Sequence, residues 1–167
     1  MKASVFKTLI CLFVILAPVL QSCSKAQKSA EDILYRICAS VELPAGSTYL
    51  SQAEEGEENY LSPDTASALY GARALEEKLP LVEEYAIYLA ASAPCEIAVF
   101  KCRSRSDTDG VAEMCLERAD ALGALMKGTA LDGLYGQARV TKHKKYVVMI
   151  LCEDHERALD AARTALK

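Results

Sequence analysis

Apolar residues fall into two runs within residues 82–103, and this pattern predicts a β-hairpin. Residues 93–94 interrupt the pattern with Ala-Pro, and the second run begins at Cys95. A break of this kind between two alternating segments is typical of an antiparallel pair. Both faces of the pair are apolar, which allows either core packing or an exposed binding patch at Tyr88 and Phe100. Core packing is the simpler interpretation, because apolar strand residues are usually buried.

A second hairpin is predicted over residues 138–154. Its turn falls near residues 142–145, where Lys-His-Lys-Lys follow one another. This basic turn could touch anionic lipid headgroups, or its lysines could simply protect a sheet edge. The arm after the turn, residues 146–152, is a continuous apolar run, so we expect it in the middle of the sheet.

Apolar positions at helical spacing predict amphipathic helices, and polar capping residues mark where they begin. The candidate caps are Ser29, Ser62, Asp107 or Asp109, and Asp154. The predicted helical segments are residues 29–41, 62–70, 72–79, 110–126 and 155–167.

The two hairpins are each followed by a capped helix, and this order suggests a pseudo-repeat. The second strands of the two units end alike, with Cys102 and Cys152 in equivalent places. The expected fold is α+β: a four-stranded antiparallel sheet built from two hairpin-helix units in the order αββαββα. We expect the helices to pack on one face, and residues 29–167 to form a single domain.

Residues 1–22 have the three-part layout of a secretory signal peptide. Lys2 and Lys7 give a basic start, and an apolar run of about 13 residues follows. That run is short of the roughly 20 residues a transmembrane helix needs. An N-terminal membrane anchor is the alternative, and Pro18 within the run argues against it.

The end of this segment, Leu-Gln-Ser-Cys at residues 20–23, resembles the bacterial lipoprotein box. The resemblance implies that Cys23 is lipidated with a diacylglycerol, carrying fatty acids such as palmitate, and becomes the first residue of the mature protein. Two acyl chains anchor a protein stably where one is marginal. Residues 23–28 would then be a lipidated tether at the extracytoplasmic face of the cell membrane. A chance cysteine after an ordinary signal peptide is the alternative.

Composition and net charge indicate which kinds of partner the domain could bind. Hydrophobic residues make up 51% of the 167 residues and charged residues 25%, which is the balance of a folded domain. Without Lys2 and Lys7 the chain has 17 basic and 23 acidic residues. A net acidic domain is a poor match for phosphate backbones, so nucleic acid is not expected as a partner.

The cysteines give no metal or redox motif. Besides Cys23 and Cys11 in the signal, the chain has Cys38, Cys95, Cys102, Cys115 and Cys152, and no Cys-x-x-Cys. Scattered thiols of this kind favour small buried hydrophobes over a disulfide. If a bridge exists, the pseudo-repeat predicts that it joins Cys102 to Cys152.

Candidate catalytic residues are few. His143 and His155 are the only histidines, and neither lies in a context that suggests a nucleophile and base. Acidic clusters at residues 47–60 and 107–113 lack the interleaved ligands of a calcium loop. A solvated loop and a helix cap explain them more simply. No catalytic residue, cofactor or metal ligand is therefore predicted, although carboxylates distant in the sequence could still meet in space.

Several segments carry a further resemblance: residues 69–71, 84–88, 95–101, the pair Glu117-Arg118, and residues 145–148. Together they look like a family of small bacterial lipoproteins, domain of unknown function number 4358, over about residues 30–166. The most specific part is Glu-Ile-Ala-Val-Phe-Lys at residues 96–101. The chain departs from the family where residues 143–145 replace a glycine-bearing turn, and in the loop before the third strand. The resemblance implies location and fold but no activity.

The sequence therefore predicts a lipid-anchored extracytoplasmic bacterial lipoprotein with a non-enzymatic binding or interaction domain at the membrane surface. Binding would use a sheet face or an edge strand. One alternative is a cell-envelope enzyme that acts through carboxylates, and another is a structural lipoprotein that assembles with itself.

Overall fold

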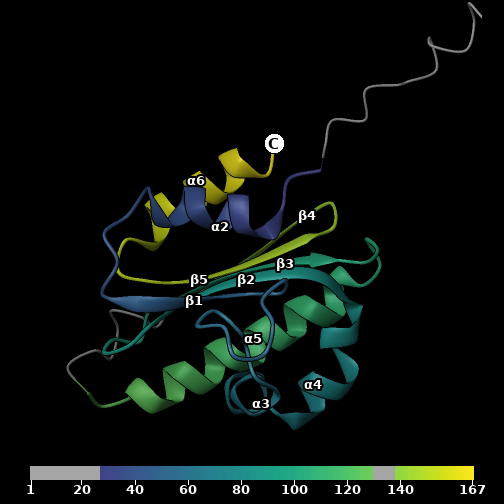
Figure 1. Ribbon diagram of the computed structural model, residues 1–167. Helices are drawn as coiled ribbons and strands as arrows, with labels where there is room; N and C mark the ends of the chain where they lie inside the picture. The colour runs from purple at the N-terminus through teal and green to yellow at the C-terminus, as the bar shows by residue number, and fades with distance from the viewer. Residues whose placement is uncertain (1–26, 130–137) are drawn as a thin grey trace, which may run out of the picture.

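The computed structural model describes residues 27–129 and 138–167, within which an antiparallel five-stranded sheet lies between two layers of helices (Figure 1). The strand order is β1-β2-β3-β5-β4. The strands are β1 (Gly46–Leu50), β2 (Val82–Ala90), β3 (Glu96–Cys102), β4 (Arg139–His143) and β5 (Tyr146–Leu151). The predicted α+β class and antiparallel sheet are confirmed, but the sheet has a fifth strand, β1.

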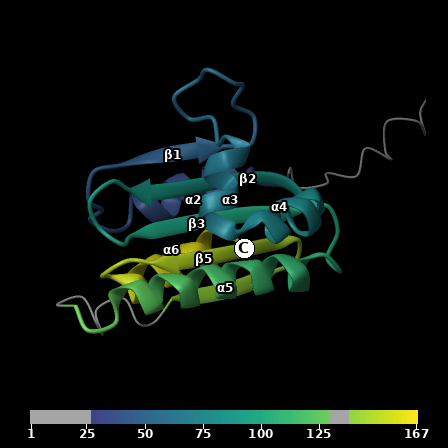
Figure 2. The same ribbon diagram turned by 90° about the horizontal axis from the view of Figure 1, so that it is seen from below.

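Helices cover both faces of the sheet, so the prediction of helices on one face is wrong. The first face is covered by α2 (Ala30–Cys38) and α6 (His155–Ala165). The opposite face is covered by α3 (Pro63–Tyr70), α4 (Ala72–Glu77) and α5 (Thr108–Met126), with a short 3₁₀ turn at Leu79–Leu81. Figure 2 shows α5 running along the sheet beside β5, with β1 at the far edge.

The two central strands explain the two-sided arrangement. Every residue of β3 and β5 is buried, and alternate side chains point to opposite faces. Ile97 joins the core under α2 and α6, whereas Phe100 joins the core against α3 and α5. Strands that are apolar on both faces need a layer on each side.

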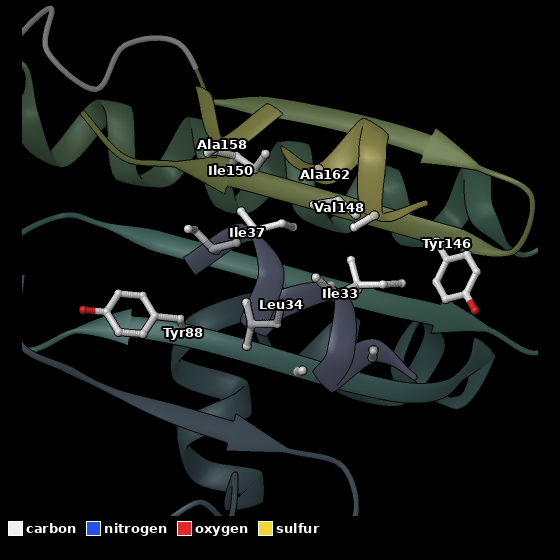
Figure 3. Close-up of a cluster of buried hydrophobic side chains, with 14 of the residues drawn as sticks. Ile33, Leu34, Ile37, Tyr88, Tyr146, Val148, Ile150, Ala158 and Ala162 are labelled. Carbon is white, nitrogen blue, oxygen red and sulfur yellow. The ribbon is translucent and has the colours of Figure 1, made fainter. Parts of the chain in front are cut away.

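Both α2 and α6 contribute side chains to the core on the first face. Figure 3 shows Ile33, Leu34 and Ile37 of α2 pointing toward the sheet, where they meet side chains of β5 such as Val148. Tyr88 and Phe100 are also buried, with 8% and 0% of their surfaces exposed. Core packing is therefore confirmed for both, and they form no exposed patch.

Both predicted hairpins are present, and β3 pairs with β5 at the centre of the sheet. Ile97 lies opposite Ile150, and Phe100 lies opposite Val147. The β4–β5 turn is closed by Lys144, whose φ of 53° is left-handed. The helices after the two hairpins, α5 and α6, lie on opposite faces, so the sequence pseudo-repeat is not a repeat of the packing.

The polar edge strand β1 covers residues 47–50 of the segment 47–60 predicted to be a solvated loop, so that prediction is wrong for these residues. Its residues Gly46, Ser47 and Thr48 are exposed, so they give no apolar signal. A Cβ at Gly46 would lie 2.4 Å from the carbonyl oxygen of Leu89, so only glycine allows this approach to β2. The glutamates that follow, at residues 54–58, are exposed as expected.

Three predicted helix caps are confirmed, and at the fourth Asp107 holds the N-cap position of α5 without a capping side-chain hydrogen bond. Ser29 Oγ accepts the N–H of Asp32 at 3.0 Å, Ser62 Oγ accepts that of Thr65 at 3.1 Å, and Asp154 caps α6. Asp107 precedes α5, but its carboxylate instead accepts hydrogen bonds from Ser104. Asp109 lies within the first turn of α5 and pairs with Lys142.

Candidate functional site

The predicted lipidation site, Cys23, and the signal segment before it lie outside the described residues. What the structure does describe is how the chain enters the domain. Tyr146 Oη donates a hydrogen bond to the carbonyl oxygen of Lys28 at 2.6 Å, and Lys28 Nζ donates to the carbonyl oxygen of Ala165. The chain is thus fastened to β5 and to the end of α6 from Lys28 onward.

The next contact holds the start of α2. The backbone N–H of Ala30 donates to Glu84 Oε2 at 3.1 Å, which places a carboxylate at the N-terminus of this helix. Backbone N–H groups at that end have no partner within the helix, and the helix dipole favours a negative charge there. Glu84 of β2 is therefore a long-range cap for α2.

Four charged residues at this end of the sheet form what we call the entry cluster: Glu83, Glu84, Lys101 and Lys145. Lys101 Nζ lies 2.6 Å from Glu84 Oε1 and 3.2 Å from Glu83 Oε1, and Lys145 Nζ lies 2.8 Å from Glu83 Oε2. Only 6% of the surface of Lys101 is exposed. A buried ammonium group needs partners of this kind.

Contacts within the entry cluster shift the pKa values of Glu83 and Lys101. Hydrogen bonds from Lys145 and Lys101 lower the pKa of the Glu83 carboxyl. Burial alone would lower the pKa of Lys101, but its hydrogen bonds to Glu84 and Glu83 raise the pKa overall. Both shifts favour the charged forms of Glu83 and Lys101.

A second ionic group lies on the opposite face of the sheet, under α3 and α5. Glu96 is fully buried; its Oε1 accepts a hydrogen bond from Tyr70 Oη at 2.9 Å, and its Oε2 accepts one from Arg118 at 2.9 Å. The Tyr70 ring meets Phe100 edge to face, with centroids 5.8 Å apart. Burial, and then the charge of Glu96, raise the pKa of Tyr70 well above its ordinary value.

This buried group is suited to holding the layers together. Both oxygens of the Glu96 carboxylate have partners, and the charge is balanced by Arg118. With 0% of Glu96 exposed, a substrate has no route to the carboxylate in this conformation. The group joins three elements, α3, β3 and α5, and does not have the accessible geometry of a general base.

The two histidines lie apart in the fold. His143 ends β4, and its Nε2 is a buried nitrogen for which the described residues offer no hydrogen-bond partner. His155 opens α6, with its Nε2 3.4 Å from Glu156 Oε1. Across residues 27–129 and 138–167, no group of three or more His, Cys, Asp or Glu side chains has a geometry that could hold a metal ion.

Two of the surface hollows are lined by residues that the structure describes. An open one of about 460 Å³ runs over α2 and α6, between Arg36 and Arg157. A small one lies between α4 and α5, beside Lys78 and Glu113. Neither is the deep cleft with paired carboxylates that the envelope-enzyme hypothesis requires.

The five cysteines of the domain are free and fall into two groups. Cys95 and Cys152 lie in the core under α2 and α6, with Cys38 packed against them. Cys102 and Cys115 lie in the core on the other face. The predicted bridge between Cys102 and Cys152 is therefore wrong, because the sheet separates the two thiols.

Comparison with protein-family models, with curated proteins and with solved structures finds no match for this chain. Among the helices that the structure describes, none is both long enough and apolar enough to cross a membrane.

Sequence reasoning missed the entry cluster and the buried Glu96 group. One signal was present: in the apolar segment 96–101, the first and last residues are Glu96 and Lys101. A charged residue inside a strand that is otherwise buried must find a partner of opposite charge. The partners Glu84 and Arg118 come from other elements, so the sequence does not identify them.

Proposed function

We propose that this chain is a lipid-anchored bacterial lipoprotein whose domain acts at the extracytoplasmic membrane surface as a non-enzymatic interaction module. The observation that carries the proposal is the early fastening of the chain at Lys28. Lys28 follows the proposed lipidated residue, Cys23, by five residues, and a fully extended chain of that length spans at most about 18 Å. A lipid on Cys23 would therefore hold the domain close to the bilayer.

The charges at the entry end suit this placement. Tyr146 follows the β4–β5 turn directly and contacts Lys28, so the basic turn of residues 142–145 lies at the same end as the tether (Figure 1). Lys142 and Lys145 have carboxylate partners, whereas Lys144 lies exposed at the tip. A basic residue near an anionic leaflet contributes about 1 kcal/mol of attraction.

The carboxylates with shifted pKa values do not have the shift that a general acid needs. The pKa values of Glu83, Asp109 and Glu113 all shift downward, because each carboxylate accepts a hydrogen bond from a lysine. A general acid at neutral pH needs the opposite shift. These carboxylates act as ion-pair partners, and the enzyme alternative gains no support from them.

The edge strand β1 is the proposed binding surface, because both faces of the sheet are covered. The N–H of Ser51 bonds to Tyr85 and the N–H of Ala91 bonds to Ala45, which fixes the alternation of the β1–β2 ladder. By that alternation, the backbone N–H and C=O of Thr48 point away from β2. An exposed edge of this kind can pair with an extended segment of a partner protein.

Two measurements test the proposal. Metabolic labelling with a fatty acid should mark the wild-type protein and not Cys23→Ala; labelling of the variant would contradict lipidation at Cys23. Crosslinking in cells, followed by mass spectrometry, should capture a partner protein with the anchored form only. Capture of second copies alone, together with a mass in solution that rises with concentration, would favour the self-assembling alternative.

A further inference from the structure

Cys95 immediately precedes β3 and Cys152 immediately follows β5, at the same end of the two central strands. Glu96 of β3 pairs with Leu151 of β5. Continued by one step beyond this last pair, the antiparallel register would bring residue 95 opposite residue 152. Both cysteines belong to the core under α2 and α6, so both side chains leave the sheet on the same face.

The continued register would suit the geometry of a disulfide. Facing residues of antiparallel strands have Cα atoms about 4.5 to 5.5 Å apart. Disulfides join Cα atoms that lie about 4.4 to 6.8 Å apart. Cys102 and Cys115 are not placed to form a disulfide with Cys152, because they lie in the core on the other face of the sheet.

Cys38 is the third thiol on this face, at the end of α2. It is partly exposed, whereas 2% of Cys95 and 4% of Cys152 are exposed. Its position depends on packing of a helix end, and no backbone pairing fixes it against either strand. The strand pair is therefore better placed for a bridge than any pair that includes Cys38.

Burial in the core disfavours the thiolate forms of Cys95 and Cys152. Burial, reinforced by the neighbouring thiols, raises the pKa of Cys95 to about 12, and burial raises the pKa of Cys152 to about 11. The reactive form is the thiolate, which is scarce at neutral pH for such groups. Oxidation therefore belongs to folding, or to moments when the strand ends open.

We propose that Cys95 and Cys152 become joined by a disulfide in the exported protein, while Cys38, Cys102 and Cys115 stay reduced. The inference rests on the proposed extracytoplasmic location, where small-molecule or protein disulfides serve as oxidants. One cysteine thiolate attacks the oxidant disulfide and releases a thiolate. The second cysteine attacks the mixed disulfide and releases another. The pair gives up two electrons and two protons, and the oxidant leaves as two thiols.

The test uses the purified full mature chain in detergent. Reduced protein is unfolded, refolded in a mixture of oxidised and reduced glutathione, quenched with an alkylating reagent, and mapped by mass spectrometry without reduction. The expected product is one linkage, between the peptides of Cys95 and Cys152, with a mass loss of two hydrogen atoms. Cys38, Cys102 and Cys115 should be alkylated.

Alanine variants distinguish this pair from others, because alanine leaves no buried hydroxyl. Cys95→Ala and Cys152→Ala should each lose the linkage, whereas Cys38→Ala and Cys102→Ala should keep it. Circular dichroism confirms that each variant has folded. A linkage that contains Cys38, or refolded wild-type protein without any linkage, would overturn the inference.

The outcome of the refolding test can be told apart from the outcome of the test for the proposed function. Glutathione is supplied in the tube, so the outcome does not depend on where the protein resides. Loss of fatty-acid labelling at Cys23 would overturn the location and leave the thiol pairing intact. Failure of the linkage in labelled, membrane-bound protein would overturn the pairing alone.

Discussion

Lys101 Nζ lies 2.6 Å from Glu84 Oε1, and the same carboxylate caps α2 through the N–H of Ala30. A single pair of side chains thus connects the central strand β3, its neighbour β2, and the first helix after the tether. Any force on a lipid anchor at Cys23 would reach the sheet through this end of the domain. The entry cluster therefore lies just after the contacts of Lys28, at the end of the domain nearest the proposed anchor.

Lys101→Met should destabilise the domain by removing the partner of Glu84 while keeping the apolar stem. Glu83 and Glu84 remain partly exposed, so their unpaired charges can be hydrated, and we expect a loss of about 1 to 2 kcal/mol. Urea unfolding followed by circular dichroism measures the change. Arg73→Met is the control, because it breaks only an exposed ion pair with Glu77 and should leave the unfolding midpoint nearly unchanged. Equal midpoints for Lys101→Met and wild type would show that the pair is not stabilising.

Arg118→Leu should be more damaging, because it leaves the carboxylate of Glu96 buried without a counter-charge. Side-chain exposure is 1% for Glu96 and 11% for Arg118, and breaking such a pair costs about 3 to 5 kcal/mol. The double variant Glu96→Leu with Arg118→Leu should regain most of that loss, since it removes both charges. Tyr70→Phe should cost less, about 1 to 3 kcal/mol, by removing one donor. A double variant as unstable as Arg118→Leu would contradict this account.

The stability of the domain should fall on acidification, in part through Glu83. Its pKa is lower in the folded protein than in the unfolded chain, because Lys145 and Lys101 donate to it. The resulting stabilisation is fully present above the unfolded pKa of about 4.5 and is lost as pH falls through the folded value. The difference in urea midpoint between wild type and Glu83→Gln should therefore be largest at pH 6 to 7 and shrink below about pH 4.5. A difference that is independent of pH would exclude this linkage.

Features carried by local pattern could be predicted from the sequence. The continuous apolar run of β5 indicated a central strand, and Ser29 and Ser62 marked two helix starts. Features that depend on distant partners could not. The exposed strand β1 has little apolar signal, since it is held by pairing with β2 and by Gly46.

The face on which each helix packs was also beyond local pattern. Cys102 and Cys152 occupy equivalent sequence positions, yet β3 and β5 pair antiparallel, so these positions fall at opposite ends of the pair. The N–H of Cys102 bonds to Lys145, and the two thiols also lie in the cores on opposite faces of the sheet. Local sequence pattern does not reveal this strand order, which brings Cys95, and not Cys102, to the end of the sheet where Cys152 lies.

Thr48→Pro tests the proposed binding edge directly. The N–H of Thr48 points away from β2 by the alternation of the ladder, so proline there removes a donor available to a partner and leaves the β1–β2 hydrogen bonds in place. We expect the variant to fold with a melting temperature close to that of wild type and to lose the protein captured by crosslinking in cells. Ser47→Pro is the matched control, because its N–H points toward β2 and its loss should lower the melting temperature. Undiminished capture by a folded Thr48→Pro variant would show that the partner binds elsewhere on the domain.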